Sequence, residues 1–228
     1  MNNIDIKILP SNGTVKGVPK EVTIRGMKGV EISTIYSSLT EASIDEVIKA
    51  VTDGGQIDVD LLTDEDKLFI LLETRKLTFG PEVKQSLRCP FCNHIHEYTI
   101  DLDNLPIHLL DETNFNDIIT LSSGDTITKR LPNKLTYEEI ENARIKFNYP
   151  PTYNFILGIA SKIDKINGSR LTIREQVEWL ENLDGKLLVE VAESINFVYG
   201  VENTYIVNCV KCGTNFTGGV GLNADLFR

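Results

Sequence analysis

Cys89-Pro90-Phe91-Cys92 and Cys209-Val210-Lys211-Cys212 hold all four cysteines of this 228-residue chain. Two Cys-x-x-Cys pairs supply four thiolates, which suit one tetrahedral zinc ion. Asn93 follows the first pair and Gly213 follows the second. Both residue types accept the left-handed backbone conformation that a tight turn around a metal requires. The pattern therefore predicts a structural zinc ion with Cys89, Cys92, Cys209 and Cys212 as its ligands.

The two pairs are far apart in the sequence. Residues 93–208 separate them, which is far more chain than a self-contained zinc finger contains. Closing a loop of that length costs about 4 kcal/mol of chain entropy. A structural zinc site contributes about 10–16 kcal/mol in peptides, so metal binding more than offsets the closure. We therefore expect the metal to join the C-terminal region to the middle of the chain.

Other uses of the cysteines stay open at this point. A redox-active pair needs the start of a helix, whereas both pairs lie between strand-like runs. Disulfides need an oxidising compartment, but Met1 leads into a polar segment without the features of a signal peptide. Buried thiols without a metal are a third alternative. His94 or His96 could also replace one cysteine, although the alternation from His96 to Leu102 is more typical of strand residues beside the site.

Composition and charge limit the classes of partner. Hydrophobic residues make up 41% of the chain and charged residues 25%, as in ordinary soluble globular proteins. No apolar run approaches the ~20 residues of a membrane span. The formal net charge of −10 disfavours nucleic acid, because phosphate binding depends on Lys and Arg. We expect neither a membrane segment nor a nucleic-acid partner.

The N-terminal region combines strand and helix signals. Alternation in Val22-Thr23-Ile24-Arg25 and in Val30-Glu31-Ile32 predicts a β-hairpin. A capping box that begins at Ser43 predicts an amphipathic helix up to residue 51. A second cap at Thr63 predicts an apolar helix that ends near Gly80. The first cysteine pair then lies on another β-hairpin.

Helical signals dominate after Pro106. Residues 118–131 predict one small hairpin. Capping boxes begin at Thr136 and at Thr172, and Pro150-Pro151 separates two of the predicted helices. Apolar residues keep helical spacing over residues 187–198, and Gly200 is expected to end that helix.

These signals predict an α+β fold. It consists of zinc-ribbon-like β-hairpins and an N-terminal β-hairpin, with a mainly α-helical insert between the two Cys-x-x-Cys pairs. We expect an N-terminal α/β region with the first zinc knuckle over residues 1–105. The helical insert covers residues 106–199, and residues 200–228 form the C-terminal hairpin that completes the ribbon.

Enzyme signatures are poor. Gly218-Gly219-Val220-Gly221 lacks the Lys and the following helix of a phosphate-binding loop. His108 is the one histidine away from the cysteine pairs. Asp64-Glu65-Asp66 falls in the first turn of a predicted helix, where the dipole favours negative charge. We expect no catalytic residues, and a cell-wall hydrolase with converging carboxylates is an alternative class.

Several short landmarks occur in a characteristic order. They are Leu9-Pro10-Ser11-Asn12-Gly13, Leu62-Thr63-Asp64-Glu65-Asp66, Leu77-Thr78-Phe79-Gly80 and the two cysteine pairs. This layout resembles the baseplate hub subunit and hub-assembly family of T-even-type contractile-tailed bacteriophages, over nearly the whole chain. The resemblance implies a non-enzymatic component of the virion tail baseplate, assembled in the host cytoplasm, with other hub or wedge proteins as partners. A zinc-ribbon transcription adaptor is the competing class.

The end of the chain is apolar. Leu226 and Phe227 precede the charged Arg228, which is unusual for a free solvated terminus. One interpretation is that this end packs on its own ribbon. The other is that Leu226 and Phe227 bind a neighbouring baseplate subunit.

Overall fold

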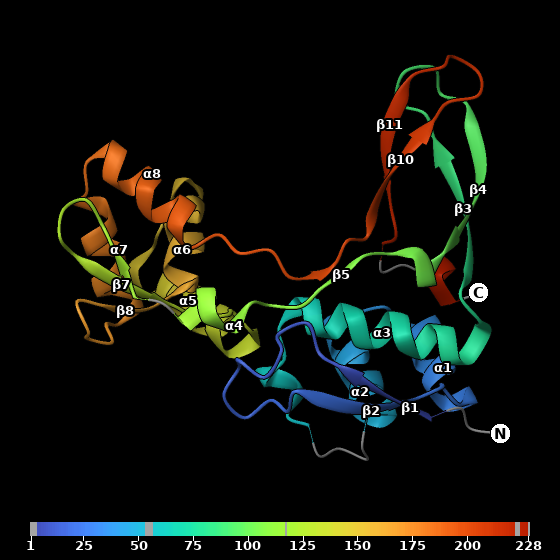
Figure 1. Cartoon of the computed structure of the whole chain (residues 1–228), viewed down its shortest axis with the longest axis horizontal. Coiled ribbons are helices and arrows are strands. Elements are labelled where there is room, and N and C mark those ends of the chain that lie inside the picture. Colours follow the sequence, from blue (N-terminus) through green and yellow to red (C-terminus); the bar gives the residue numbers. More distant parts are fainter. Residues whose placement is uncertain (1–3, 53–56, 117, 222–223, 228) are drawn as a thin grey trace. The chain divides into compact units, whose positions relative to one another are not determined.

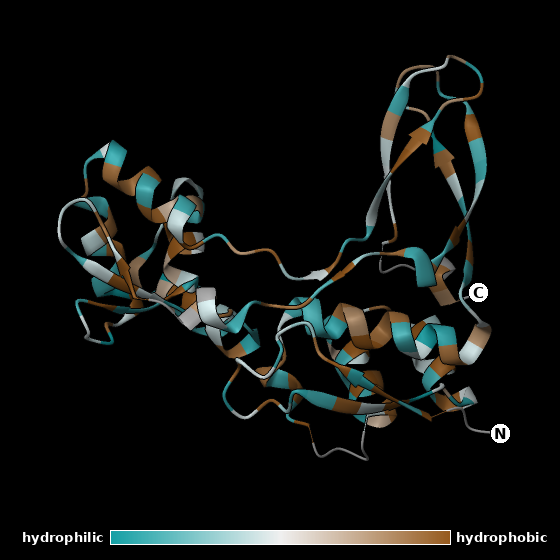
Figure 2. Ribbon diagram, viewed as in Figure 1, coloured by the Kyte–Doolittle hydropathy of each residue, from teal (hydrophilic) through white to brown (hydrophobic). Residues whose placement is uncertain are grey.

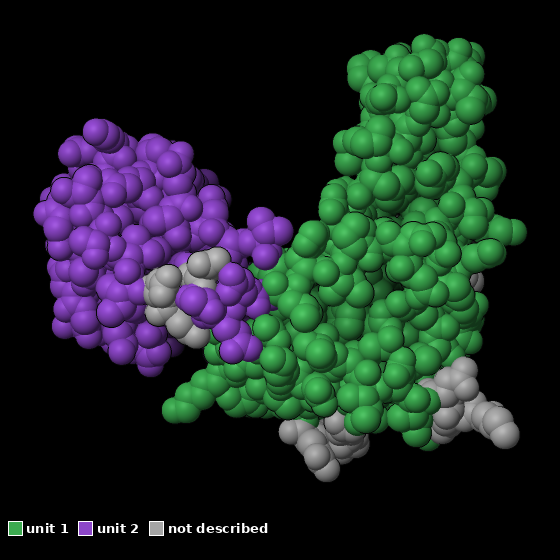
Figure 3. Space-filling view, in the orientation of Figure 1, with its two compact units in different colours: residues 1–59, 64–109, 199–228 green, residues 60–63, 110–198 purple. Residues whose placement is uncertain are grey.

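The computed structural model describes residues 4–52, 57–116, 118–221 and 224–227. The chain forms two compact units of mixed helices and small antiparallel sheets (Figures 1 and 3). Unit 1 comprises residues 1–59, 64–109 and 199–228, and unit 2 comprises residues 60–63 and 110–198. Unit 1 therefore contains both cysteine pairs, and most of the region expected to be a helical insert forms unit 2.

The N-terminal part of unit 1 is a two-stranded sheet with three helices. Its elements are β1 (Ile4–Ile8), β2 (Glu21–Arg25), α1 (Gly29–Ser37), α2 (Glu41–Val51) and α3 (Asp64–Phe79). β1 and β2 are antiparallel, with Ile4 opposite Arg25 and Ile8 opposite Glu21. Polar and apolar residues follow one another along α3 (Figure 2), and its Ile70 and Leu71 are fully buried. This helix is the centre of the unit 1 core.

The turn after β1 is fastened to the first turn of α3. Asn12 and Gly13 both have positive φ angles, 54° and 81°, so the turn uses residue types that tolerate this conformation. The backbone N–H of Ser11 donates to Asp66 Oδ1 at 2.9 Å, and both residues are fully buried. Two of the landmark motifs of the sequence therefore meet in one buried hydrogen bond.

The predicted pairing of residues 22–25 with residues 30–32 is wrong. The first segment does form a strand, but its partner is β1, and residues 30–32 lie in α1. Glu31 explains the difference, because its carboxylate accepts a hydrogen bond from the N–H of Lys28 at 2.5 Å and binds Arg25 at 2.8 Å. A glutamate that reaches back to the residue before a helix is a capping feature, and three alternating residues cannot distinguish it from a strand.

Two β-hairpins carry the cysteine pairs in their turns. The first joins β3 (Glu82–Arg88) to β4 (Ile95–Asp101), and the second joins β10 (Thr204–Asn208) to β11 (Asn215–Gly219). The hairpins contact each other through Tyr98 and Tyr205, whose rings stack with centroids 5.2 Å apart. The Tyr205 hydroxyl also donates to Gln85 Oε1 at 3.1 Å. The predicted hairpin at the first cysteine pair is confirmed.

Gly218 makes this contact possible. It lies opposite Tyr205 in the β10–β11 register. A Cβ atom on Gly218 would come within 2.8 Å of the Tyr205 ring and 3.1 Å of Leu87 Cδ1. A side chain at position 218 would therefore displace the Tyr205 ring that stacks on Tyr98, and glycine avoids this clash.

Arg75 ties α3 to the first hairpin and to the chain end. Its guanidinium is almost fully buried. Nε donates to the carbonyl oxygen of Leu226 at 3.0 Å, Nη2 donates to that of Glu82 at 2.5 Å, and Nη1 donates to that of Gly80. The carbonyl oxygen of Phe227 accepts from the Tyr36 hydroxyl at 2.9 Å. The short helix η5 (Ala224–Phe227) is thereby held against α1, α3 and β3.

The segments that precede and follow residues 110–198 of unit 2 are paired with each other inside unit 1. β5 (Ile107–His108) is antiparallel to β9 (Gly200–Val201). Gly200 has a φ of 100°, and a Cβ atom there would lie 2.8 Å from Glu65 Cγ. The neighbouring Tyr199 hydroxyl donates to Glu65 Oε2 at 2.9 Å. Gly200 was expected to end a helix, but it permits close packing of β9 on α3, and the preceding helix ends at Ser194.

Unit 2 is a three-stranded antiparallel sheet with helices. Its elements are α4 (Glu112–Asn116), β6 (Ile119–Thr120), β7 (Thr126–Lys129), α5 (Lys134–Phe147), α6 (Asn154–Ser161), β8 (Ile163–Ile166), α7 (Ile173–Glu181) and α8 (Gly185–Ser194). The strand order is β6-β7-β8, and the buried core includes Ile127, Ile163, Leu180 and Val191. The small hairpin predicted over residues 118–131 is confirmed as β6 and β7.

The helix caps test the sequence signals directly. The capping box of Thr172 and Glu175 is confirmed at the start of α7. The caps predicted at Ser43 and Thr136 are wrong, because Thr40 and Asn133 are the capping residues of α2 and α5. Ser43 and Thr136 instead donate their backbone N–H groups to those caps, at 3.3 and 3.1 Å. Helices with several Ser, Thr or Asn residues near the start offer more than one plausible cap.

Arg75→Lys will lower the free energy of unfolding by about 2–3 kcal/mol. Lysine keeps the charge but cannot donate in three fixed directions to separate carbonyl groups, so buried acceptors lose their partners. Urea unfolding of the full chain measures the effect. Arg144→Lys on the exposed face of α5 is the control, for which we expect a change within about 0.5 kcal/mol. Equal unfolding midpoints for the two variants would contradict the anchoring role of Arg75.

Candidate metal centre

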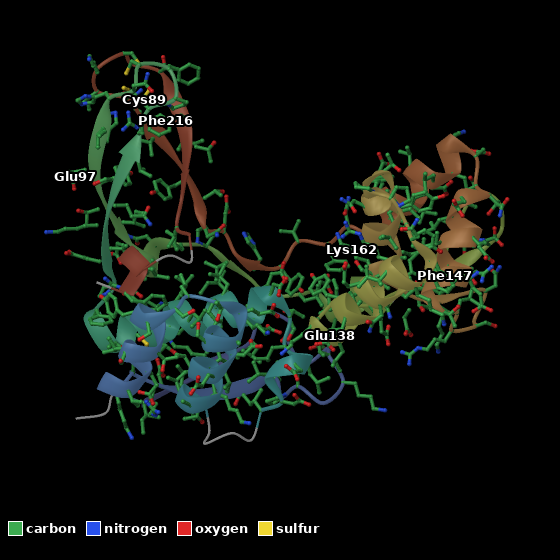
Figure 4. All side chains as sticks on the ribbon, turned by 180° about the vertical axis from the view of Figure 1, so that it is seen from behind. Cys89, Glu97, Glu138, Phe147, Lys162 and Phe216 are labelled. Carbon is green, nitrogen blue, oxygen red and sulfur yellow. The ribbon has the colours of Figure 1, made fainter. Side chains whose placement is uncertain are left out.

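The turns of the two hairpins bring four thiols together. Cys89 Sγ lies 3.8 Å from Cys212 Sγ, and Cys92 Sγ lies 3.5 Å from Cys209 Sγ. All four sulfur atoms are within 4.8 Å of one another. A tetrahedral ion with metal–sulfur bonds of about 2.3 Å separates its ligand sulfurs by about 3.8 Å. The four sulfurs therefore have the spacing of a tetrahedral metal site, and Figure 4 labels Cys89 at this end of the hairpins.

The same turn is built twice. In the first hairpin, the N–H of Asn93 donates to the carbonyl of Cys89 at 2.9 Å, and Asn93 has a φ of 59°. In the second, the N–H of Gly213 donates to the carbonyl of Cys209 at 2.7 Å, and Gly213 has a φ of 72°. The left-handed residue expected after each pair is confirmed. Each turn presents its two sulfurs to the same point, which explains the spacing of the cysteines.

The thiols of Cys92 and Cys212 have different pKa values, partly because of hydrogen bonds to their sulfur atoms. The hydroxyl and the backbone N–H of Thr214 donate to Cys212 and lower its pKa to about 6. The backbone N–H of His94 acts to lower the pKa of Cys92, but burial and the three neighbouring thiols outweigh it and raise that pKa to about 12. The thiolate form is therefore favoured at Cys212 and disfavoured at Cys92. Metal binding to such a set releases protons.

His96 contacts the cluster of four cysteines without belonging to it. Its side chain is buried, and its Nε2 lies 3.3 Å from Cys209 Sγ. The group of residues whose ligand atoms converge contains the four cysteines and neither His94 nor His96. The centroid of the His96 ring lies 4.7 Å from that of the His94 ring and 6.1 Å from that of the Phe216 ring. A ring N–H that donates to a ligand sulfur stabilises the thiolate form.

The cysteines differ in exposure. Cys89 and Cys209 are fully buried, Cys92 is half-buried and Cys212 is exposed. The residues between the cysteines lie on the outside, with Phe91 66% and Val210 81% exposed. The site therefore has a closed side toward the strands and an open side toward solvent.

Three residues around this centre lie outside the Cys-x-x-Cys pattern. Thr214 follows Gly213 in the second turn, the same place that His94 takes after Asn93 in the first. That equivalence could have identified both as donors to sulfur. His96 could be placed only as a strand residue, because its contact with Cys209 depends on how the second hairpin packs on the first.

A family model described as T4 bacteriophage base plate protein matches residues 1–220. The chain belongs to this family. No curated protein and no solved structure matched the chain in the same comparisons. The resemblance to T-even-type baseplate proteins is thereby confirmed, and the family places the chain among structural proteins of the phage tail.

Other expectations for this baseplate chain concern its surface. Leu226 and Phe227 are buried within unit 1, where their carbonyl groups bind Arg75 and Tyr36. Their binding to a partner stays a prediction, and it would require the chain end to leave this position. His108 is exposed, with Nε2 3.5 Å from Glu202 Oε2. In the described part of the chain, no helix is long and apolar enough to cross a membrane.

His96→Phe will lower the metal affinity of the chain about tenfold, because it keeps a ring in the buried position but removes the ring nitrogen that lies 3.3 Å from Cys209 Sγ. Competition with a chromogenic chelator for Zn²⁺ or Cd²⁺ measures the affinity. His108→Phe, which changes an exposed histidine of the same unit, is the matched control and should leave the affinity unchanged. Identical affinities for the two variants would show that His96 has no role in the site.

Proposed function

We propose that the chain is a non-catalytic component of the hub region of the baseplate, and that one structural zinc ion holds its two hairpins together as a zinc ribbon. The spacing of the four cysteine sulfurs carries the metal part of this proposal. Four thiolates in tetrahedral arrangement select zinc or iron. Zinc suits a structural role because it has no redox chemistry.

The energetics of the hairpins support a metal. An isolated two-stranded hairpin is at best marginally stable in water. Away from the cysteines, the contacts between the hairpins include the Tyr98–Tyr205 stack and the Tyr205–Gln85 hydrogen bond. Such contacts contribute about 1 kcal/mol each, whereas a structural zinc site contributes about 10–16 kcal/mol in peptides. The arrangement of the hairpins would then depend mainly on the ion.

The acidic residues support a non-catalytic role. A general acid in a hydrolase needs a carboxyl group with a raised pKa. Hydrogen bonds lower the pKa of four carboxyl groups despite any effect of burial: Asp5, Glu31, Asp125 and Glu175. Other acids have structural partners, such as Glu65 with Tyr199 and Asp66 with Ser11. These observations disfavour the cell-wall hydrolase.

Charge disfavours the transcription adaptor. The net charge of −10 repels a phosphate backbone, and the cysteine turns carry Arg88 and Lys211 but no basic cluster. Reduced cysteines of the host cytoplasm remain free to bind metal, which agrees with assembly there. The partners we propose are other hub or wedge proteins of the baseplate.

Purified chain should contain about one zinc ion per molecule by elemental analysis. Cys212→Ser removes one ligand and should lower the melting temperature markedly, because several kcal/mol of folding energy are coupled to the metal. Val210→Ser, in the same turn and highly exposed, is the matched control and should keep both zinc and stability. Iron in place of zinc would correct the identity of the metal. Metal-free, fully stable protein would refute the site.

Cross-linking of purified phage particles tests the hub assignment. Mass spectrometry should detect this chain in the particles, with cross-links to subunits at the centre of the baseplate. Cross-links confined to peripheral subunits would move the chain from the hub to the wedges. Such a result would leave its family membership intact, because that rests on the match over residues 1–220.

A further inference from the structure

Strand β1 has its apolar side chains outside. Ile4, Ile6 and Ile8 share one face of the strand and are 63%, 64% and 39% exposed. The alternate residues Asp5 and Lys7 lie on the other face, where Lys7 Nζ is 3.1 Å from Glu73 Oε2 of α3. A surface strand normally buries its apolar face and exposes its charges. The inverted pattern leaves a row of three isoleucines in contact with water.

The backbone of β1 is open on one edge. Among the described strands, β1 pairs with β2 alone. Leu9, the next residue, donates its N–H to the carbonyl of Lys20 at 2.9 Å. Because antiparallel pairing alternates along a strand, the N–H and C=O groups of Asp5 and Lys7 also face β2, and those of the three isoleucines face away. The N–H of Ile6 accordingly donates to Asp5 Oδ1 of its own chain at 2.9 Å.

The sequence of this edge is self-complementary. Ile4-Asp5-Ile6-Lys7-Ile8 has the same pattern of apolar and charged residues in both directions, with opposite charges at equivalent places. When two copies pair in antiparallel fashion about Ile6, Asp5 of each faces Lys7 of the other. Each Ile4 then faces Ile8 of the second copy, and the two Ile6 residues face each other. A shift by one residue would place isoleucines opposite charges.

We propose that β1 is a homodimer interface, at which two copies of the chain join their edges into a four-stranded antiparallel sheet in the order β2-β1-β1-β2. The backbone groups that point away from β2 are those that this register requires. The pairing unites the isoleucines of both copies into one apolar row. On the opposite face it places Asp5 of each copy beside Lys7 of the other, in addition to the Asp5–Lys7 ion pair of 2.9 Å within each copy. The proposal extends the function proposed above and does not depend on the metal.

The second copy fits this edge better than an unrelated strand. An isologous contact needs one surface patch that complements itself. This five-residue strand complements itself in its apolar side chains, in its charges and in the direction of its free backbone groups. One pair of short strands is a small interface, so we expect a reversible, concentration-dependent dimer. The Ile6 N–H exchanges its bond with Asp5 for one across the two-fold axis, which also limits the affinity.

Sedimentation of the full chain at concentrations up to about 1 mM tests the proposal, and the mass should rise from monomer to dimer. Ile6→Pro removes an outward N–H that β2 does not use, so the dissociation constant should rise about tenfold or more while the unfolding midpoint changes little. Ile6→Val keeps the N–H and the β-branched side chain, and it should dimerise like the parent chain. A chain that stays monomeric throughout, or open-ended association, would overturn the proposal.

A charge exchange tests the register. Asp5→Lys places lysines opposite one another across the axis, and Lys7→Asp does the same with aspartates, so each variant alone should dimerise more weakly. Mixed in equal amounts, they should form a heterodimer at least as tight as the parent dimer, because every pair across the axis is then opposite in charge. A misfolded variant cannot give this rescue. A mixture that stays monomeric while both variants remain folded would refute the antiparallel register about Ile6.

Discussion

Unit 1 depends on the return of residues 199–228 to the first 109 residues of the chain. Three contacts accomplish this return. β9 pairs with β5, and the second cysteine hairpin packs on the first. In η5, the carbonyl oxygen of Leu226 accepts a hydrogen bond from Arg75. Each joins segments separated by the whole of unit 2, so each must offset part of a loop-closure cost of about 4 kcal/mol. Glycines at positions 200 and 218 permit two of the three approaches.

The cysteine centre is built from two short stretches of sequence, because the backbone of each turn positions its own pair of sulfurs. Two copies of one turn, each closed by a left-handed residue, place the four sulfurs within 4.8 Å of one another. The remaining residues adjust its chemistry. Thr214 favours the thiolate at Cys212, and His96 contacts the sulfur of the buried Cys209. The hairpins therefore provide both the four thiols and the groups that contact their sulfurs.

The distribution of polar groups in unit 1 fits a protein that works by contact with other proteins. Buried polar groups such as Arg75, Asp66 and Glu31 are used to hold elements in place. Apolar side chains are exposed on β1 and at the ends of the cysteine hairpins, where Phe91 and Val210 lie outside. Single exposed apolar residues are common, but a continuous row on an open strand edge is normally covered or blocked. The baseplate family is consistent with surfaces that become buried on assembly.

The sequence by itself determined what depends on neighbouring residues. The cysteine pairs with their left-handed turns, the Thr172–Glu175 cap and the small hairpin of β6 and β7 could all be predicted, because each is closed within a few residues. The landmark motifs also indicated the family that the comparison confirmed. Only the tertiary structure decided the pairing of β2 with β1, the position of Gly200 in a strand, and the burial of Leu226 and Phe227. These features depend on contacts between segments that are distant in the sequence. A local pattern does not indicate which distant segment will pack against it.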